Sequence, residues 1–139
     1  IFSGMMLSAR AQEESGGKKT AVHPPAAAVA AFQKSFPGAT KVKWEREGAL
    51  YEVNFREQSK EMSALYNEQG QWQETETGIA LSELPASVTA YVKMHYPKAR
   101  IKEAARIQKP NRVIQYEAEV NGKDLIFDAN GQFLRETED

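Results

Sequence analysis

The order of residues in this chain repeats itself after sixty positions. Pro25 and Pro37 bracket an Ala-rich stretch, and Pro85 and Pro97 bracket a second one, so each proline recurs sixty residues later (85 − 25 and 97 − 37). Within both stretches, apolar residues return every three or four positions, which is the spacing of one helix face. Proline fits the first turn of a helix, and the residue before a proline is biased away from helical geometry. Each stretch is therefore predicted to be a helix that starts at its first proline and stops just before its second.

Alternating apolar and polar residues follow each predicted helix. Tyr51, Val53 and Phe55 alternate with polar residues, and this period of two is typical of a strand with one buried face. In the second half, Asn121-Gly122 indicates a two-residue hairpin turn, because both turn positions need a positive φ. The pattern predicts four strands in each half, near residues 41–45, 51–56, 62–66 and 71–77, then near 101–107, 114–120, 125–128 and 132–137.

This element order defines the predicted fold class. Short connections between successive strands force antiparallel pairing, and a helix with one apolar stripe can cover one face of the resulting sheet. The prediction is an α+β fold: a tandem duplication of a helix followed by a four-stranded antiparallel sheet. Residues 24–77 form the first repeat, 78–83 a linker and 84–139 the second repeat. The sheet face opposite the helix is expected to meet water or a partner.

Composition excludes several classes of protein. The 18 basic and 19 acidic residues give a net charge of −1, so no basic surface for nucleic acid is expected. No apolar run approaches the roughly 20 residues of a membrane helix, so stable membrane insertion is not expected. The chain has no cysteine, which removes disulfides, thiolate metal sites and cysteine nucleophiles together.

The first residues point to export. Residues 1–11, IFSGMMLSARA, resemble the end of a signal-peptide hydrophobic region followed by an A-x-A cleavage site before Gln12. We predict that 1–11 is the remnant of a signal peptide. Residues 12–23 are mostly polar and rich in Gly, Ser and Lys, and they are predicted to form a flexible leader. The expected location is therefore periplasmic or secreted.

A known family shows the same ordered set of short motifs. They are Phe36-Pro37-Gly38-Ala39 with Val42 and Trp44, Tyr51 to Phe55, the turn from Tyr66 to Trp72, Leu84-Pro85 and Tyr96-Pro97. Over about residues 25–138 the chain resembles the PepSY-like, beta-lactamase-inhibitor-like family of exported bacterial proteins. The resemblance implies two tandem helix-and-sheet units with a concave sheet surface, as in beta-lactamase inhibitory proteins. By analogy with PepSY domains it implies a role in binding or restraining peptidases, and it supplies no catalytic residue.

Catalytic and metal-binding signatures do not emerge from the sequence. His23 lies in the predicted leader, and His95 has no nucleophile motif beside it. Asp128-Ala129-Asn130 begins like a calcium loop, but the sixth position, which needs Gly, holds Phe133. Paired glutamates at 74 and 76, 117 and 119, and 136 and 138 have the spacing of a solvent-facing strand. We therefore predict no enzyme activity, no cofactor and no metal.

The remaining candidates form a protein-binding surface. Trp44 and Trp72 lie in otherwise polar strands, which favours partial exposure of their rings. The predicted site residues are Trp44, Trp72, Lys43, Glu52, Asn54 and Arg56. The main hypothesis is a non-enzymatic exported binding module, inhibitor-like or peptidase-regulating, that binds another exported protein or peptide as a monomer or weak dimer. The alternative is a small-ligand-binding or envelope accessory protein with a pocket between the repeats.

Overall fold

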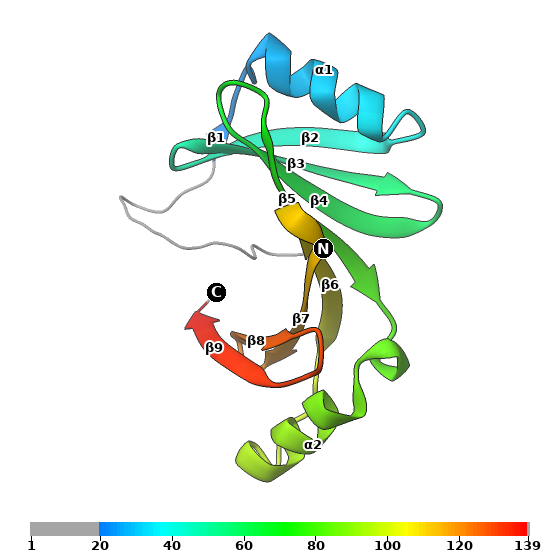
Figure 1. Cartoon of the computed structure of the whole chain (residues 1–139), viewed down its shortest axis with the longest axis vertical. Helices are drawn as coiled ribbons and strands as arrows, with labels where there is room; N and C mark the ends of the chain where they lie inside the picture. The colour runs from blue at the N-terminus through cyan, green and yellow to red at the C-terminus, as the bar shows by residue number, and fades with distance from the viewer. Residues whose placement is uncertain (1–19, 139) are drawn as a thin grey trace. The chain divides into compact units, whose positions relative to one another are not determined.

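The computed structural model describes residues 20–138 and has an α+β fold, as predicted (Figure 1). The predicted signal-peptide remnant lies outside the described residues. The elements are β1 (Thr20–Ala21), α1 (Ala26–Ser35), β2 (Thr40–Glu47), β3 (Leu50–Glu57), β4 (Lys60–Tyr66), β5 (Trp72–Ile79), the 3₁₀ turn η2 (Leu81–Glu83), α2 (Ala86–His95), β6 (Glu103–Lys109), the 3₁₀ turn η3 (Pro110–Arg112), β7 (Val113–Val120), β8 (Lys123–Asp128) and β9 (Phe133–Glu138).

The prediction of one four-stranded sheet for each repeat is not matched, and the sequence left open whether the two sheets are continuous. Within the described residues, the strands form a nine-stranded sheet in the order of the chain, β1 to β9. Residues 78–83 were expected to be a linker, but Gly78 and Ile79 extend β5 and Leu81–Glu83 form η2. An extended strand continues readily through these two residues, so the linker is shorter than predicted. The chain divides into two compact units, which we call unit 1 (to Thr75) and unit 2 (from Glu76).

Unit 1 is built around helix α1, which lies over β2 and β3 (Figure 1). The helix begins after Pro25 and ends at Ser35, as the bracketing prolines predict. It buries Ala28 and Phe32, and the Phe32 ring packs edge-on against Phe55 with 4.9 Å between centroids. The core of unit 1 contains Ala28, Phe32, Val53, Phe55, Ala64 and Tyr66.

Unit 2 has the same local backbone around its helix. The residue that follows α1, Phe36, has φ −132° and ψ 66°, and its counterpart after α2, Tyr96, has φ −136° and ψ 64°. Helix α2 buries Val88 and Val92, sixty residues after Ala28 and Phe32. The core of unit 2 contains Leu84, Val88, Val92, Ala104, Ala118, Val120, Leu125 and Phe127.

The turn before the last strand of each unit is also alike. In unit 1 the side chain of Asn67 accepts hydrogen bonds from the backbone N–H of Gln69 and Gln71, at 3.0 and 2.8 Å. In unit 2 Asp128 accepts bonds from the N–H of Asn130 and Gln132, both at 2.9 Å. Each turn thus carries a short oxygen-bearing side chain that fixes the backbone locally.

The central hairpins of the two units differ in length. In unit 1 the β3–β4 ladder runs from the pair Tyr51–Tyr66 to the pair Glu57–Lys60. In unit 2 the β7–β8 ladder runs from the pair Gln115–Asp128 to the pair Val120–Lys123. Counted from the corresponding pairs Tyr51–Tyr66 and Tyr116–Phe127, the unit 1 hairpin extends two residues further per strand (57 − 51 against 120 − 116). The predicted Asn121-Gly122 turn is confirmed, with φ values of 55° and 75°.

The N-terminal edge of the sheet differs from the prediction. The flexible leader was predicted to reach residue 23, but Thr20 and Ala21 form β1 and pair with Arg46 and Glu45 of β2. The outer edge of β2 offers unpaired N–H and C=O groups, which a short extended segment can bind.

The pairing of β2 with β3 and of β8 with β9 is interrupted by register shifts. Such irregularities make an edge a poorer template for further strands.

Candidate functional site

Trp44 packs inside unit 1 and is not an exposed anchor. Its partner across the ladder is Val53, a core residue. The indole is half-buried and lies edge-on to Phe32, with 5.7 Å between ring centroids, and 6.0 Å from Tyr66. The polar neighbours of Trp44 in sequence point to the other side of the strand, so the indole packs on the core while part of its surface stays accessible.

The four polar site residues lie on the opposite sheet face but are not equally accessible. Lys43 pairs with Asn54 across the ladder, and Arg56 bonds to the Glu61 carboxylate. The side chain of Lys43 is 67% exposed, whereas Glu52 is fully buried at 0%. Glu52 therefore cannot contact a partner in this structure. The predicted surface retains Lys43, the half-buried Asn54 and the half-buried Arg56.

The face opposite the helices was expected to meet water or a partner, and much of it is buried instead. In unit 1 the buried residues of this face include Ser63 and Leu65, which neighbour Asn54 and Glu52 on β3. In unit 2 they include Ala105, Ile107, Glu117, Asp124 and Ile126. A face with this mixture of apolar and acidic side chains is not the bare solvent face that strand alternation alone suggests.

Trp72 is exposed and held in one orientation. It is the first residue of β5, and 37% of its surface is accessible. Its indole N–H donates a 2.7 Å hydrogen bond to the hydroxyl of Thr75. The structure thus places the two predicted tryptophans differently: Trp44 is half-buried against the core, and Trp72 lies at the surface.

Unit 2 carries an exposed group of stacked rings that the sequence reasoning did not select. Tyr91 of α2 stacks on His95 with 4.0 Å between centroids and on Phe133 of β9 with 4.7 Å and an interplanar angle of 8°. We call His95, Tyr91 and Phe133 the aromatic stack. Met94 and Leu134, which neighbour it in sequence, are 76% and 44% exposed. The available signal was the match between the Tyr66–Trp72 and Phe127–Phe133 turns, which puts Phe133 in the position of Trp72.

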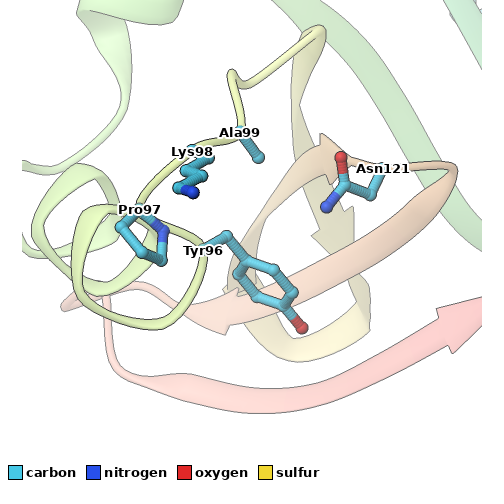
Figure 2. A pocket seen from close by; sticks show the side chains of 5 residues that line it. All are labelled: Tyr96, Pro97, Lys98, Ala99 and Asn121. Carbon is cyan, nitrogen blue, oxygen red and sulfur yellow. The ribbon is translucent and has the colours of Figure 1, made fainter.

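An open depression lies within unit 2 where the loop after α2 meets the tip of the β7–β8 hairpin (Figure 2). It has a volume of about 330 Å³ and is lined by Tyr96, Pro97, Lys98, Ala99 and Asn121. The Asn121 amide faces the depression from the hairpin side, and the Tyr96 ring forms one wall with its hydroxyl directed away (Figure 2). The depression has apolar walls, one ammonium group and one amide.

A polar clamp fixes Tyr96 beside this depression. Its hydroxyl donates a 2.7 Å hydrogen bond to Glu136, whose other carboxylate oxygen lies 3.2 Å from the Lys123 ammonium. The hydrogen bond from Tyr96, followed by that from Lys123, holds the pKa of Glu136 below its usual range. The same contacts with Glu136 raise the pKa of both Tyr96 and Lys123. The clamp therefore keeps a carboxylate ionised and joins the end of α2 to β8 and β9.

Residues 20–138 bring no three His, Cys, Asp or Glu side chains together in an arrangement that could hold a metal ion. Neither helix in this range has the length and hydrophobicity that crossing a membrane requires. His95 packs against Tyr91 in the aromatic stack. What the site offers chemically is exposed rigid rings and one small cationic depression.

The fold and these surfaces define a small helix-and-sheet protein with surfaces suited to binding. The family model described as beta-lactamase-inhibitor-like, PepSY-like matches residues 49–135, and the chain belongs to that family. A comparison with curated proteins gave no match.

Solved structures agree with this assignment. A BLIP-like protein from Bacteroides fragilis is similar, with 28% identity and a TM-score of 0.64 over 84% of this chain and 86% of that chain. A protein from Bacteroides eggerthii that is predicted to be periplasmic has the same fold at 17% identity, with a TM-score of 0.71 over 84% of this chain and 89% of that chain. The sequence-based recognition of the family is thereby confirmed.

Proposed function

We propose that this protein is an exported, non-enzymatic module that binds another protein through the aromatic stack of unit 2. The observation that carries the proposal is the parallel stacking of Tyr91 on Phe133, which holds a surface ring in one orientation before any partner arrives. Rigid aromatic anchors lose little conformational entropy on binding, and aromatic residues are enriched among the residues that dominate interface energies. Met94, one turn after Tyr91 on the same helix, is a further exposed apolar side chain.

Family membership supports an inhibitor-like role and a periplasmic or secreted location. The chain belongs to a beta-lactamase-inhibitor-like, PepSY-like family, and one similar structure is a BLIP-like protein. The partner classes to test are therefore secreted serine beta-lactamases and periplasmic peptidases. In this proposal the polar residues Lys43, Asn54 and Arg56 are secondary, because they lie in unit 1 and Glu52 between them is buried.

The test is a binding and inhibition panel of purified enzymes from both classes, with the full chain immobilised for interferometry. We expect at least one enzyme to bind. Phe133→Ala should weaken that binding about 30-fold, the loss expected for a dominant interface residue. Met94→Ala should weaken it less. Val113→Ala is the matched control, because Val113 is also an exposed apolar residue of unit 2, at 43%.

Two results would count against the proposal. If no enzyme of either class binds, the inhibitor-like role is wrong. If an enzyme binds the wild-type protein and the Phe133→Ala and Met94→Ala variants equally, the aromatic stack is not the contact surface. The urea midpoint of each variant separates lost contact from lost folding, and Met94 is exposed enough that its truncation leaves the core intact.

A further inference from the structure

The loops that follow the two helices have the same backbone but different surroundings. Ala39 N–H bonds to Phe36 O at 3.1 Å in unit 1, and Ala99 N–H bonds to Tyr96 O at 3.0 Å in unit 2. Gly38 and Lys98 hold the same position in these loops, each directly after a proline. Their backbone N–H groups therefore correspond.

In unit 1 a carboxylate of the chain itself occupies this position. The Gly38 N–H donates a 3.1 Å hydrogen bond to Glu57 at the tip of the β3–β4 hairpin. A side chain at position 38 would crowd that carboxylate, because a Cβ there would lie 3.1 Å from its oxygen. Glycine at this position thus leaves room for Glu57.

In unit 2 the corresponding hairpin is too short to supply such a group. It ends at Val120 and Lys123, two residues per strand earlier than in unit 1. The space in front of the loop is the open depression lined by Lys98 and Asn121 (Figure 2). Where unit 1 has a glycine and an internal carboxylate, unit 2 has a lysine and an opening.

We propose that the depression of unit 2 is a binding site for the carboxylate group of a ligand, which takes the position that Glu57 holds in unit 1. The Lys98 N–H donates to one carboxylate oxygen, and the Lys98 ammonium and the Asn121 amide supply further donors. Hydrogen bonds from a cationic donor to a carboxylate are among the stronger kinds in proteins. The Tyr96 ring and Pro97 pack against the apolar part of the ligand. This site is separate from the aromatic stack and does not depend on the proposed function.

The test follows backbone and side-chain amide resonances of the full ¹⁵N-labelled chain by NMR. The probes are acetate and a capped tripeptide with one central glutamate, and the neutral controls are acetamide and the same peptide with glutamine. We expect both carboxylate probes to shift the Lys98 backbone amide and the Asn121 side-chain amide in a saturable way. If the peptide binds more than about tenfold more tightly than acetate, the ligand carboxylate comes from a polypeptide side chain. If the two affinities are similar, the ligand is a free small acid. Both outcomes support the site.

Variants in both units sharpen the test. Lys98→Gln should weaken binding about tenfold, and Asn121→Asp should abolish it, because a second carboxylate repels the ligand. Asn121 has a positive φ, which aspartate also tolerates, so this variant should fold. In unit 1, Glu57→Ala removes the internal carboxylate, and acetate should then shift the Gly38 amide, whereas in the wild-type protein, where Glu57 accepts that N–H, it should not.

The proposal is overturned if acetamide shifts the same resonances as strongly as acetate, or if Lys98→Gln binds acetate as tightly as the wild-type chain. An absent response of Gly38 in the Glu57→Ala variant would count against the correspondence between the two loops.

Discussion

The close approach of Gly70 to helix α1 allows a sharp prediction about stability. Gly70 has φ +81°, and a Cβ at this position would lie 2.6 Å from the carbonyl oxygen of Ala27 and 2.9 Å from its Cβ. These atoms belong to the first turn of the helix, so they cannot move without shifting it. Gly48 also has a positive φ, +63°, but a Cβ there would meet nothing within 4 Å. Gly48→Ala is therefore a matched control for Gly70→Ala.

The two variants should separate backbone strain from steric overlap. Left-handed geometry costs an alanine about 1–2 kcal/mol, and both variants bear this cost. Forcing a methyl group into packed surroundings adds about 1–3 kcal/mol, which applies to Gly70→Ala alone. Gly70→Ala should therefore lower the free energy of unfolding by about 1–3 kcal/mol more than Gly48→Ala.

Urea unfolding followed by circular dichroism measures this difference. With a typical dependence on urea of about 2 kcal/mol per molar, the midpoints should differ by about 0.5–1.5 M at equal slopes. Equal midpoints for the two variants would refute the reasoning. They would mean that the turn does not pack against α1 as the structure has it.

Other predictions concern groups that titrate or lack partners. The buried Tyr66 hydroxyl has no hydrogen-bond partner. Tyr66→Phe should therefore leave the free energy of unfolding, measured by urea, unchanged or raise it by up to about 1 kcal/mol. Burial raises the pKa of Tyr66 to about 12. The stabilisation from the neutral tyrosine is therefore complete below pH 10 and is lost as the pH rises from 10 to about 12. Absorbance at 295 nm should show this late ionisation. Tyr96→Phe should raise the pKa of Glu136 toward its ordinary value, measured by carboxyl ¹³C shifts; in the wild-type protein the stabilisation from Glu136 is present at neutral pH and is lost as the pH falls through its lowered pKa. Gly131→Ala should destabilise the protein, because the new Cβ would lie 2.0 Å from the Ser87 hydroxyl oxygen. Adding Ser87→Gly removes that oxygen, so the double variant should have a higher urea midpoint than Gly131→Ala alone.

Helices and strands followed from the sequence because their signals are local. Pro25 and Pro85 mark the helix starts, and the two-residue alternation of Tyr51, Val53 and Phe55 places all three on the buried side of β3. Whether the strands form two sheets or one is not a local property. It depends on whether the strand that ends unit 1 stops or continues, and Gly78 carries no signal strong enough to decide this.

The binding surface was harder to predict, because exposure depends on what lies over a face. Alternation correctly separates Trp44 from Lys43, but it does not say which side the helix covers at that strand. Glu52 shows the same limit: alternation places it opposite the core face but does not reveal that it is completely buried. The aromatic stack joins α2 to β9, about 40 residues apart, so no window of sequence contains it.

The depression of unit 2 arises from two differences between the units that are sterically linked. A lysine at position 38 would crowd the Glu57 carboxylate, and a glutamate reaching the loop of unit 2 would occupy the depression. Each unit therefore combines the loop residue with the hairpin length that suits it: glycine with the long hairpin, lysine with the short one. The cationic residue Lys98 thus stands in the loop position whose counterpart in unit 1, Gly38, binds an anion. A short hairpin combined with a lysine in the loop is what we expect of a site that binds the carboxylate of a ligand in place of an internal one.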